Sequence, residues 1–197
     1  MDMYQKRKIR AEKKKNDSQK NFSKVSISWY PGHMAKTMKQ VEEDLKLVDI
    51  VIEILDARIP ISSQNPEVQK LIKNKKKIVI LNKSDLANES ETNKWIKYFE
   101  KKHVPSILCN SNNGMGANNI VGKINEMMTE ERNIAQQKGR NKIARAMIIG
   151  VPNVGKSSFI NRVSSKTAMK VGNKPGVTKN KQWIRLANNI ELLDTPG

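Results

Sequence analysis

Residues 150–157 have the types and the spacing that would suit binding of a phosphate chain. They read GVPNVGKS, so that Gly150, Gly155, Lys156 and Ser157 fit the pattern G-x-x-x-x-G-K-[ST]. Glycines at these positions let backbone N–H groups turn toward phosphate oxygens at the positive end of a helix. Lys156 is expected to reach the β- and γ-phosphates, and the Ser157 hydroxyl is expected to ligate Mg²⁺. A plain glycine-rich turn is the weaker alternative, because a strand pattern precedes the motif and a helical pattern follows it.

A second segment near the end of the chain suits the same chemistry. In LLDTPG, Asp194 leaves an apolar strand at the point where a carboxylate commonly holds Mg²⁺ through water, and the Gly197 amide could meet the γ-phosphate. DTPG alone is a weak signal, but downstream of a phosphate loop it is a strong one. Asn153, Val154 and Ser158 complete the set of phosphate-loop residues that we expect to contact the nucleotide.

The tetrapeptide NKSD at 82–85 indicates which base is bound. A carboxylate at Asp85 could accept from both N1–H and the 2-amino group of guanine, whereas adenine offers no such pair of donors. Asn82 is expected to contact the base edge and brace neighbouring loops, and the stem of Lys83 is expected to lie over the ring. Asn110 and Ser111 fit a loop that places a backbone N–H at guanine O6, although the same residues are ordinary loop chemistry. A polar turn between strand and helix is the alternative for NKSD taken alone.

Hydrophobic periodicity and turn residues predict alternating helices and strands, hence an α/β fold with a six-stranded, mostly parallel sheet. Asn65 and Pro66 mark the start of one short helix as its N-cap and first residue. The interval 135–142 is expected to be a polar linker. We expect helices over about 34–47, from Pro66, over about 90–102, over a long stretch from Ile120 to Ile134, and after the phosphate loop. We expect strands at 47–58, 75–82, 104–111, 144–150, 181–189 and 189–197. The last two strands are expected to form a hairpin.

The order of these motifs along the chain is unusual. The base-reading segment comes first, then the second base loop, the phosphate loop and the Mg²⁺ aspartate, whereas most GTP-binding proteins begin with the phosphate loop. The ends of parallel strands share one edge of a sheet, so the motifs can still meet. Because compact domains have nearby termini at their surface, rejoining the old ends through the linker at 135–142 is physically mild. We therefore predict a Ras-like P-loop fold that is circularly permuted.

Composition and charge indicate the setting. The net charge is +18, of which residues 1–24, with nine basic and three acidic side chains, carry +6 and the remaining body +12. This excess predicts a polyanionic partner, with nucleic acid or a charged membrane as the usual choices and a lysine-rich solvated surface as the alternative. The arm at 1–24 is expected to be disordered. With Cys109 as the only cysteine and no signal peptide or membrane span, we expect a soluble, cytoplasmic protein.

Together these segments resemble the ribosome biogenesis GTPase A family of circularly permuted GTPases. The resemblance runs from about residue 26 to the end, so residues 25–197 are expected to form the permuted GTPase domain, and it implies a C-terminal helical RNA-binding domain that this chain does not include. The segments that carry it are WYPGHMAKT (29–37), LDARIPISSQNP (55–66), NKSD (82–85), GVPNVGKSSFIN (150–161), KVGNKPGVTKNKQW (170–183) and LLDTPG (192–197).

The resemblance also implies roles for further residues. Thr178 matches the switch I threonine that closes over Mg²⁺ and the γ-phosphate, and it joins Ser157 and Asp194 in the metal set. His33 matches a histidine implicated in hydrolysis, with helix capping as the alternative, so His33, Thr178 and Lys156 are the catalytic candidates. Asn153 sits where related GTPases coordinate K⁺, with a loop-bracing asparagine as the alternative.

The sequence thus predicts a Mg²⁺-dependent GTPase that binds GTP and GDP and acts as an assembly switch on the large ribosomal subunit precursor and its rRNA. Switch I is itself basic, so nucleotide state could gate contact with rRNA phosphates. Its lysines are Lys166, Lys170, Lys174, Lys179 and Lys181. One alternative is a nucleotide-gated RNA-binding module with little or no hydrolysis, and another is an ordinary P-loop ATPase or kinase. A setting on an organellar or nuclear ribosome is a variant of the main hypothesis.

Overall fold

The computed structural model describes residues 32–167, 182–186 and 188–194, apart from the side chains of residues 32–35, 165–167 and 182. The chain divides into two compact units, residues 1–37 and 38–197, and the sheet and the candidate site lie in the second unit. Within the described ranges, no helix combines the length and the apolar character that crossing a bilayer requires.

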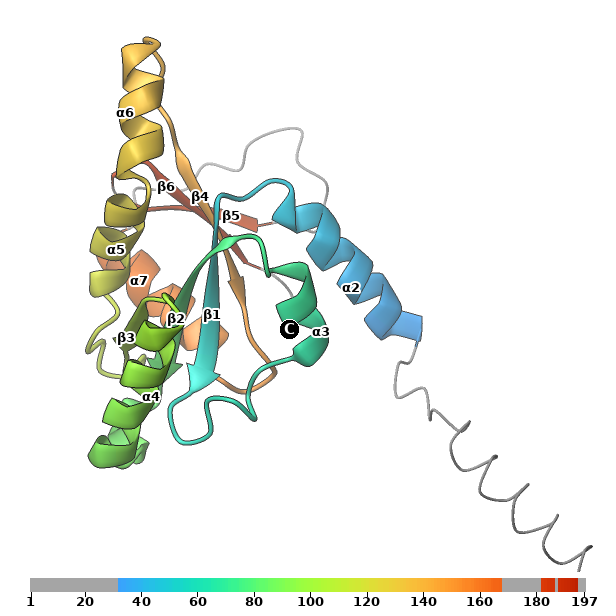
Figure 1. Ribbon diagram of the computed structural model, residues 1–197, viewed down its shortest axis with the longest axis vertical. Coiled ribbons are helices and arrows are strands. Elements are labelled where there is room, and N and C mark those ends of the chain that lie inside the picture. The colour runs from blue at the N-terminus through green and yellow to red at the C-terminus, as the bar shows by residue number, and fades with distance from the viewer. Residues whose placement is uncertain (1–31, 168–181, 187, 195–197) are drawn as a thin grey trace, which may run out of the picture. The chain divides into compact units, whose positions relative to one another are not determined.

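Six strands form one sheet in the order β3-β2-β1-β4-β6-β5 (Figure 1). All neighbours are parallel except β5 and β6, which pair as an antiparallel hairpin. The predicted six-stranded, mostly parallel sheet is therefore confirmed, and its central strands are β1 and β4. The strands are β1 (Ile50–Asp56), β2 (Lys76–Asn82), β3 (Ser106–Leu108), β4 (Ala144–Ile149), β5 (Gln182–Leu186) and β6 (Ile190–Asp194).

Helices cover both faces of this sheet, and β1 shows how the sequence arranges them. Every residue of β1 is buried, and alternate side chains point to opposite faces because the side-chain period of a strand is two. Ile52 and Ile54 join the core cluster that contains residues of α5 and α7, whereas Val51 packs in the cluster with α2 and α3, and Leu55 in the one with α4. The helices are α2 (Gly32–Leu45), α3 (Pro66–Leu71), α4 (Glu89–Lys101), α5 (Asn119–Met127), α6 (Thr129–Gln137) and α7 (Lys156–Thr167).

Local signals in the sequence determine several boundaries. Asn65 caps α3, since its side-chain oxygen accepts from the backbone N–H groups of Glu67 and Val68, with Pro66 as the first helical residue. Asn188 and Asn189 both have positive φ, 61° and 54°, as the two residues of a tight hairpin turn require. The predicted start of α3 and the predicted hairpin are both confirmed.

The long helix predicted over Ile120 to Ile134 was wrong in detail, because the chain forms two helices that meet at Met128. The Thr129 hydroxyl donates to the Asn125 carbonyl at 2.9 Å, and this bond to the residue four positions earlier competes with the helical backbone bond and bends helices. The predicted linker 135–142 also begins too early, since α6 continues to Gln137. The remaining helices and strands lie where the sequence predicted them, within a few residues at their ends.

Several predictions concern residues that lie outside the described part of the chain. They are the arm at 1–24, Thr178, Gly197, the side chains of His33 and Lys166, and the switch I lysines Lys170, Lys174, Lys179 and Lys181.

Candidate nucleotide-binding site

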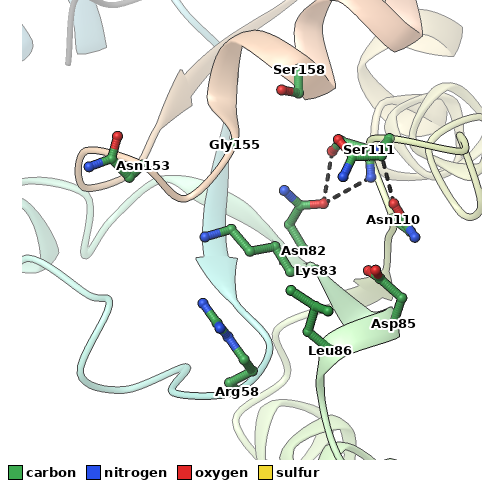
Figure 2. Close-up of a pocket in the computed structure, with 11 residues that line it drawn as sticks. Arg58, Asn82, Lys83, Asp85, Leu86, Asn110, Ser111, Asn153, Gly155 and Ser158 are labelled. Atoms are coloured by element: carbon green, nitrogen blue, oxygen red, sulfur yellow. Dashed lines mark hydrogen bonds between the residues drawn. The ribbon is translucent and has the colours of Figure 1, made fainter.

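A pocket of about 360 Å³ is formed by the segments that follow four parallel strands and by the start of α7 (Figure 2). Residues far apart in the sequence therefore meet at one edge of the sheet, as the prediction of a permuted fold required. The base-reading segment and the phosphate loop both contribute. The lining residues are Arg58, Asn82, Lys83, Asp85, Leu86, Asn110, Ser111, Asn112, Asn153, Gly155 and Ser158.

Asn82 joins three of these segments. It ends β2 with a side chain that is buried, and its Nδ2 donates to the Val154 carbonyl of the phosphate loop at 2.8 Å. Its Oδ1 accepts from the backbone N–H of Ser111 at 3.1 Å and from the Ser111 hydroxyl at 2.8 Å. The amide therefore has partners on both of its ends, and the bracing that we expected of Asn82 is present in the structure. A contact between Asn82 and the base edge stays a prediction.

Asp85 follows on a short turn, Ser84–Leu86, and its exposed side chain lines the pocket. Within the described part of the chain, the Asp85 carboxylate has no hydrogen-bond or ion-pair partner, so its oxygens are available to a ligand. Two hydrogen bonds hold this turn in place. Ser84 donates to the Cys109 carbonyl through its N–H, at 3.1 Å, and through its hydroxyl, at 3.0 Å. The position of the carboxylate is thus set by the backbone at the end of β3.

The loop after β3 forms the neighbouring wall of the pocket. Asn110 is buried, and its Oδ1 accepts from the N–H groups of Asn112 and Asn113. Arg162 of α7 donates to the carbonyls of Ser111 and Asn112, which ties the loop to the helix that follows the phosphate loop. The N–H of Ser111 is donated to Asn82 and the N–H of Asn110 to the Met115 carbonyl, and the expected donation of a backbone N–H of this loop to guanine O6 stays a prediction.

The phosphate loop lies against Asn82 so closely that residue 155 must be glycine. A Cβ atom built on Gly155 would lie 2.3 Å from Nδ2 of Asn82, and the φ of Gly155 is +97°. Val154 is buried beside it, whereas Asn153 is exposed with φ of 65°. Ser158 lines the pocket, and Ser157, in the first turn of α7, is exposed but does not line it.

Lys156 reaches across its own loop. Its Nζ donates to the carbonyls of Gly150, at 2.7 Å, and Val151, at 3.3 Å. Burial lowers the pKa of Lys156, and the charge of Asp194 opposes that shift. Burial likewise raises the pKa of Asp194, and Lys156 opposes it. Both groups are therefore partly shielded from water, and the Lys156 ammonium, which donates to two carbonyls of its own loop, would gain by exchanging them for charged phosphate oxygens.

The oxygen donors near this loop fit magnesium. Mg²⁺ takes carboxylate, hydroxyl and phosphate oxygens and keeps several waters, so one carboxylate such as Asp194 and one hydroxyl such as Ser157 suffice on the protein side. Across the described ranges, no cluster of three or more His, Cys, Asp or Glu side chains could hold a metal by itself. The residues therefore suit a metal that binds together with nucleotide phosphates rather than a site built from protein alone.

Sequence analysis missed several residues at the pocket. Arg58, Leu86 and Asn112 line it, and Asp56 pairs with two cations beside it. A signal for Asp56 did exist, because an aspartate at the carboxyl end of a buried apolar strand lies at the same edge of the sheet as the other motifs. The arginine two residues later in LDAR was the second part of that signal.

Sequence comparison relates this chain to known GTPases. Residues 145–197 match a family described as "50S ribosome-binding GTPase". The chain is 48% identical over 172 residues to Ribosome biogenesis GTPase A of Bacillus licheniformis, covering 87% of this chain and 61% of that protein. It is 37% identical over 172 residues to the protein of the same name from Thermotoga maritima, covering 87% of this chain and 58% of that one. The chain thus spans about three fifths of the length of these relatives.

Structural comparison agrees. A structure titled "Crystal structure of GNP-bound YlqF from T. maritima" matches with a TM-score of 0.56 and 31% identity, covering 82% of this chain and 57% of that one. A GDP-bound structure of YlqF matches with a TM-score of 0.55, also at 31% identity, covering 80% and 57% of the two chains. The predicted fold class is confirmed, with a circular permutation that is consistent with these neighbours. Over the residues that align, this chain is therefore similar to the Ribosome biogenesis GTPase A proteins and to the YlqF structures.

Proposed function

We propose that this chain binds GTP and GDP, hydrolyses GTP, and acts as a switch in assembly of the large ribosomal subunit. One observation carries the nucleotide part of this proposal. The carboxylate of Asp85, which has no partner among the described residues, and the glycine loop around Gly155 line the same pocket, and Asn82 bonds to the loop directly. A guanine base at one end and a phosphate chain at the other match this arrangement. The neighbours titled as GDP-bound and GNP-bound support it.

Each end of the pocket has a distinct task in this proposal. Asp85 accepts from guanine N1–H and the 2-amino group, and the stem of Lys83 lies along the base. Lys156 leaves the carbonyls of its own loop and binds the β- and γ-phosphates, with the backbone of residues 153–158 around them. Asn110 and Ser111 hold the second base loop in place. The Gly197 amide is assigned to the γ-phosphate.

The metal and the hydrolytic step complete the proposal. Ser157, Asp194 and Thr178 would hold Mg²⁺, which neutralises charge on the phosphate oxygens. Thr178 would close over the metal in the GTP state, and His33 would orient the attacking water. Asn153 would contribute to a K⁺ site, in keeping with its exposure and left-handed backbone beside the pocket. Because no residue of the described site supplies an arginine to the γ-phosphate, we expect slow turnover that a bound ribosomal particle accelerates.

The ribosomal partner is proposed from the relatives and from charge. The matched relatives carry the name Ribosome biogenesis GTPase A, and the matched family is described as a 50S ribosome-binding GTPase. A net charge of +18 favours binding to rRNA phosphates, and we place this binding in the cytoplasm. We assign the nucleotide-dependent part of this binding to the basic switch I segment, which Thr178 would order in the GTP state.

Two other functions make different predictions. A nucleotide-gated RNA-binding module would bind particles according to nucleotide but would turn over GTP no faster in their presence. A P-loop ATPase or kinase would exchange labelled GDP for ATP. Guanine recognition through Asp85 predicts that GDP and GTP displace labelled GDP while ATP does not.

Sedimentation with large-subunit precursors tests the assembly function. The chain is spun with particles in the presence of GDP and of a non-hydrolysable GTP analogue, across a series of salt concentrations. We expect more chain in the particle fraction with the analogue, and faster GTP turnover when particles are added. Equal binding with both nucleotides would overturn the switch, and unchanged turnover would favour the RNA-binding module.

A further inference from the structure

Asp56 lies at the end of β1 directly beside the base-reading segment. In the register of the sheet it is paired with Asn82 of β2, so it is one residue away from Lys83. Its side chain carries a charge and yet is only 5% exposed. Among the described residues, no contact joins it to the phosphate loop. A buried carboxylate at this position needs partners of opposite charge.

Two cations supply these partners, and both line the nucleotide pocket. Arg58 grips the carboxylate with a fork, from Nε to Oδ1 at 2.9 Å and from Nη2 to Oδ2 at 2.7 Å, and adds a backbone N–H at 3.1 Å. Lys83 donates from Nζ to Oδ2 at 3.0 Å. Asp56 therefore holds both side chains at once (Figure 2 shows Arg58 and Lys83 together on one side of the pocket, with Asp85 on the other).

The backbone of Lys83 explains why such a hold is useful. Its φ of 60° and ψ of 35° place it in the left-handed region, between the fixed side chain of Asn82 and the turn that carries Asp85. A free lysine side chain samples many rotamers, and restricting it costs binding free energy when a ligand must do so. With its ammonium fixed on Asp56, the Lys83 stem is already extended along the pocket wall before a ligand arrives.

We propose that Asp56 is a positioning residue for nucleotide binding: it fixes the ammonium of Lys83, and Arg58 fixes Asp56. The short segment LDAR thereby forms one wall of the base site, opposite the carboxylate of Asp85. Ser63 supports this wall from behind, because its hydroxyl accepts from the Asp56 N–H at 3.1 Å and donates to the Pro60 carbonyl at 3.0 Å. The inference rests on the proposed binding of guanine nucleotide.

The test is Asp56→Asn, which keeps the shape of the side chain and removes its charge. Affinity for a fluorescent GDP analogue is measured by titration, and the melting temperature is measured on the same samples without nucleotide. We expect the Kd to rise about tenfold, as for loss of a charge-assisted hydrogen bond to a binding residue. The matched control is Glu53→Gln. Glu53 lies on the same strand, is 2% exposed and is paired with Lys77, but it does not line the pocket.

A double-mutant cycle separates positioning from stability. If Asp56 acts through Lys83, then Asp56→Asn should weaken binding strongly in the parent chain and hardly at all in a Lys83→Ala background. Glu53→Gln should change the melting temperature and leave the Kd as it is. Equal effects of Asp56→Asn in both backgrounds, or an unchanged Kd in the parent, would overturn the inference. Absence of GDP binding by the parent chain would instead overturn the proposed function.

Discussion

The side-chain amide of Asn82 donates to the carbonyl of Val154 at 2.8 Å, which links the base-reading segment directly to the phosphate loop. The same side chain accepts two bonds from Ser111, so three loops from separate strands depend on one buried residue. Residues 82 and 154 lie far apart in the sequence, and only the parallel arrangement of β1, β2 and β4 brings them together. The geometry of the pocket is therefore a property of the sheet edge rather than of any single loop.

Removing the Asn82 side chain should damage stability and binding together. Asn82→Ala leaves the Val154 carbonyl and two donors of Ser111 without their partner, which should lower the free energy of unfolding by about 2–3 kcal/mol. We expect binding of labelled GDP to fall by at least tenfold in titration. The control is Asn88→Ala, which removes the N-cap of α4 and a bond from the Ser90 hydroxyl, and should cost about 1 kcal/mol with no change in GDP affinity. A comparable loss of affinity in both variants would contradict the bracing role.

Asp85→Asn should change which base is bound. Because a neutral amide cannot accept from both guanine N1–H and the 2-amino group, we expect GDP affinity to drop on the order of 100-fold or more. The affinity of the variant for xanthosine diphosphate, which carries an oxygen in place of the 2-amino group, should fall far less than its affinity for GDP. Competition against labelled GDP measures both. Asp49→Asn is the control, since Asp49 pairs with Lys142 at the start of β1 and should leave the ranking of nucleotides unchanged.

Two glycine substitutions should have opposite outcomes. Gly155→Ala places a Cβ 2.3 Å from Asn82 at a φ of +97°, so we expect loss of nucleotide binding and a lower melting temperature. Gly122 lies on an exposed turn of α5, where an added Cβ meets nothing within 4 Å. Gly122→Ala should therefore stabilise the fold by about 1 kcal/mol and leave binding unchanged. Normal GDP affinity in Gly155→Ala would contradict the close approach of the two loops.

The ion pairs of Asp56 predict a dependence of stability on pH. Hydrogen bonds from Arg58, followed by those from Lys83, hold the pKa of Asp56 well below its usual range. A carboxyl with a lowered pKa in the folded state stabilises the fold fully above its unfolded pKa, about 3.9, and this contribution is lost as the pH falls toward the folded value. Urea unfolding should thus show the parent chain more stable than Asp56→Asn at pH 7, with the difference shrinking below about pH 4.

For Glu53 we expect the opposite change of stability with pH in the same urea-unfolding experiment. Burial raises the pKa of Glu53, and Lys77 opposes that shift. The folded state therefore favours the protonated acid, and the contribution of Glu53 to stability should grow as the pH falls through its raised pKa. The stability of the parent relative to Glu53→Gln should then rise on acidification. Parallel trends for the two variants would show that general charge repulsion, rather than these sites, sets the pH dependence.

The strands, the loops at their ends and the permuted order could be predicted from the sequence because each depends on local pattern. The apolar run of β1 and the cap at Asn65 act over a few residues, so the printed sequence suffices to place them. The break at Met128 was missed because the helical pattern of apolar residues continues through it. The bond from the Thr129 hydroxyl to the Asn125 carbonyl, which accompanies the break, cannot be seen in that pattern. The boundary of the linker was placed too early because Ala135, Gln136 and Gln137 suit the last turn of a helix as well as a polar linker.

The pairing of Asp56 with Lys83 could not be predicted, because it depends on strand register. Only when β1 and β2 are aligned with Asp56 beside Asn82 does the carboxylate come within reach of the Lys83 ammonium. A shift of one residue would turn Asp56 to the other face of the sheet. Likewise, the engagement of the Ser111 N–H by Asn82 is a contact between separate strands, and no spacing within either motif indicates it.

The central position of β4 has a consequence for how the molecule is made on the ribosome. Translation proceeds from the N-terminus, so β1, β2 and β3 with the base-reading turn leave the exit tunnel before the phosphate loop exists. One side of β1 stays open until β4 pairs with it, and an open strand edge can pair wrongly with another strand. A nascent chain halted before Ala144 would therefore carry the turn at residues 82–85 without the phosphate loop, and the two segments could meet only after β4 has been made.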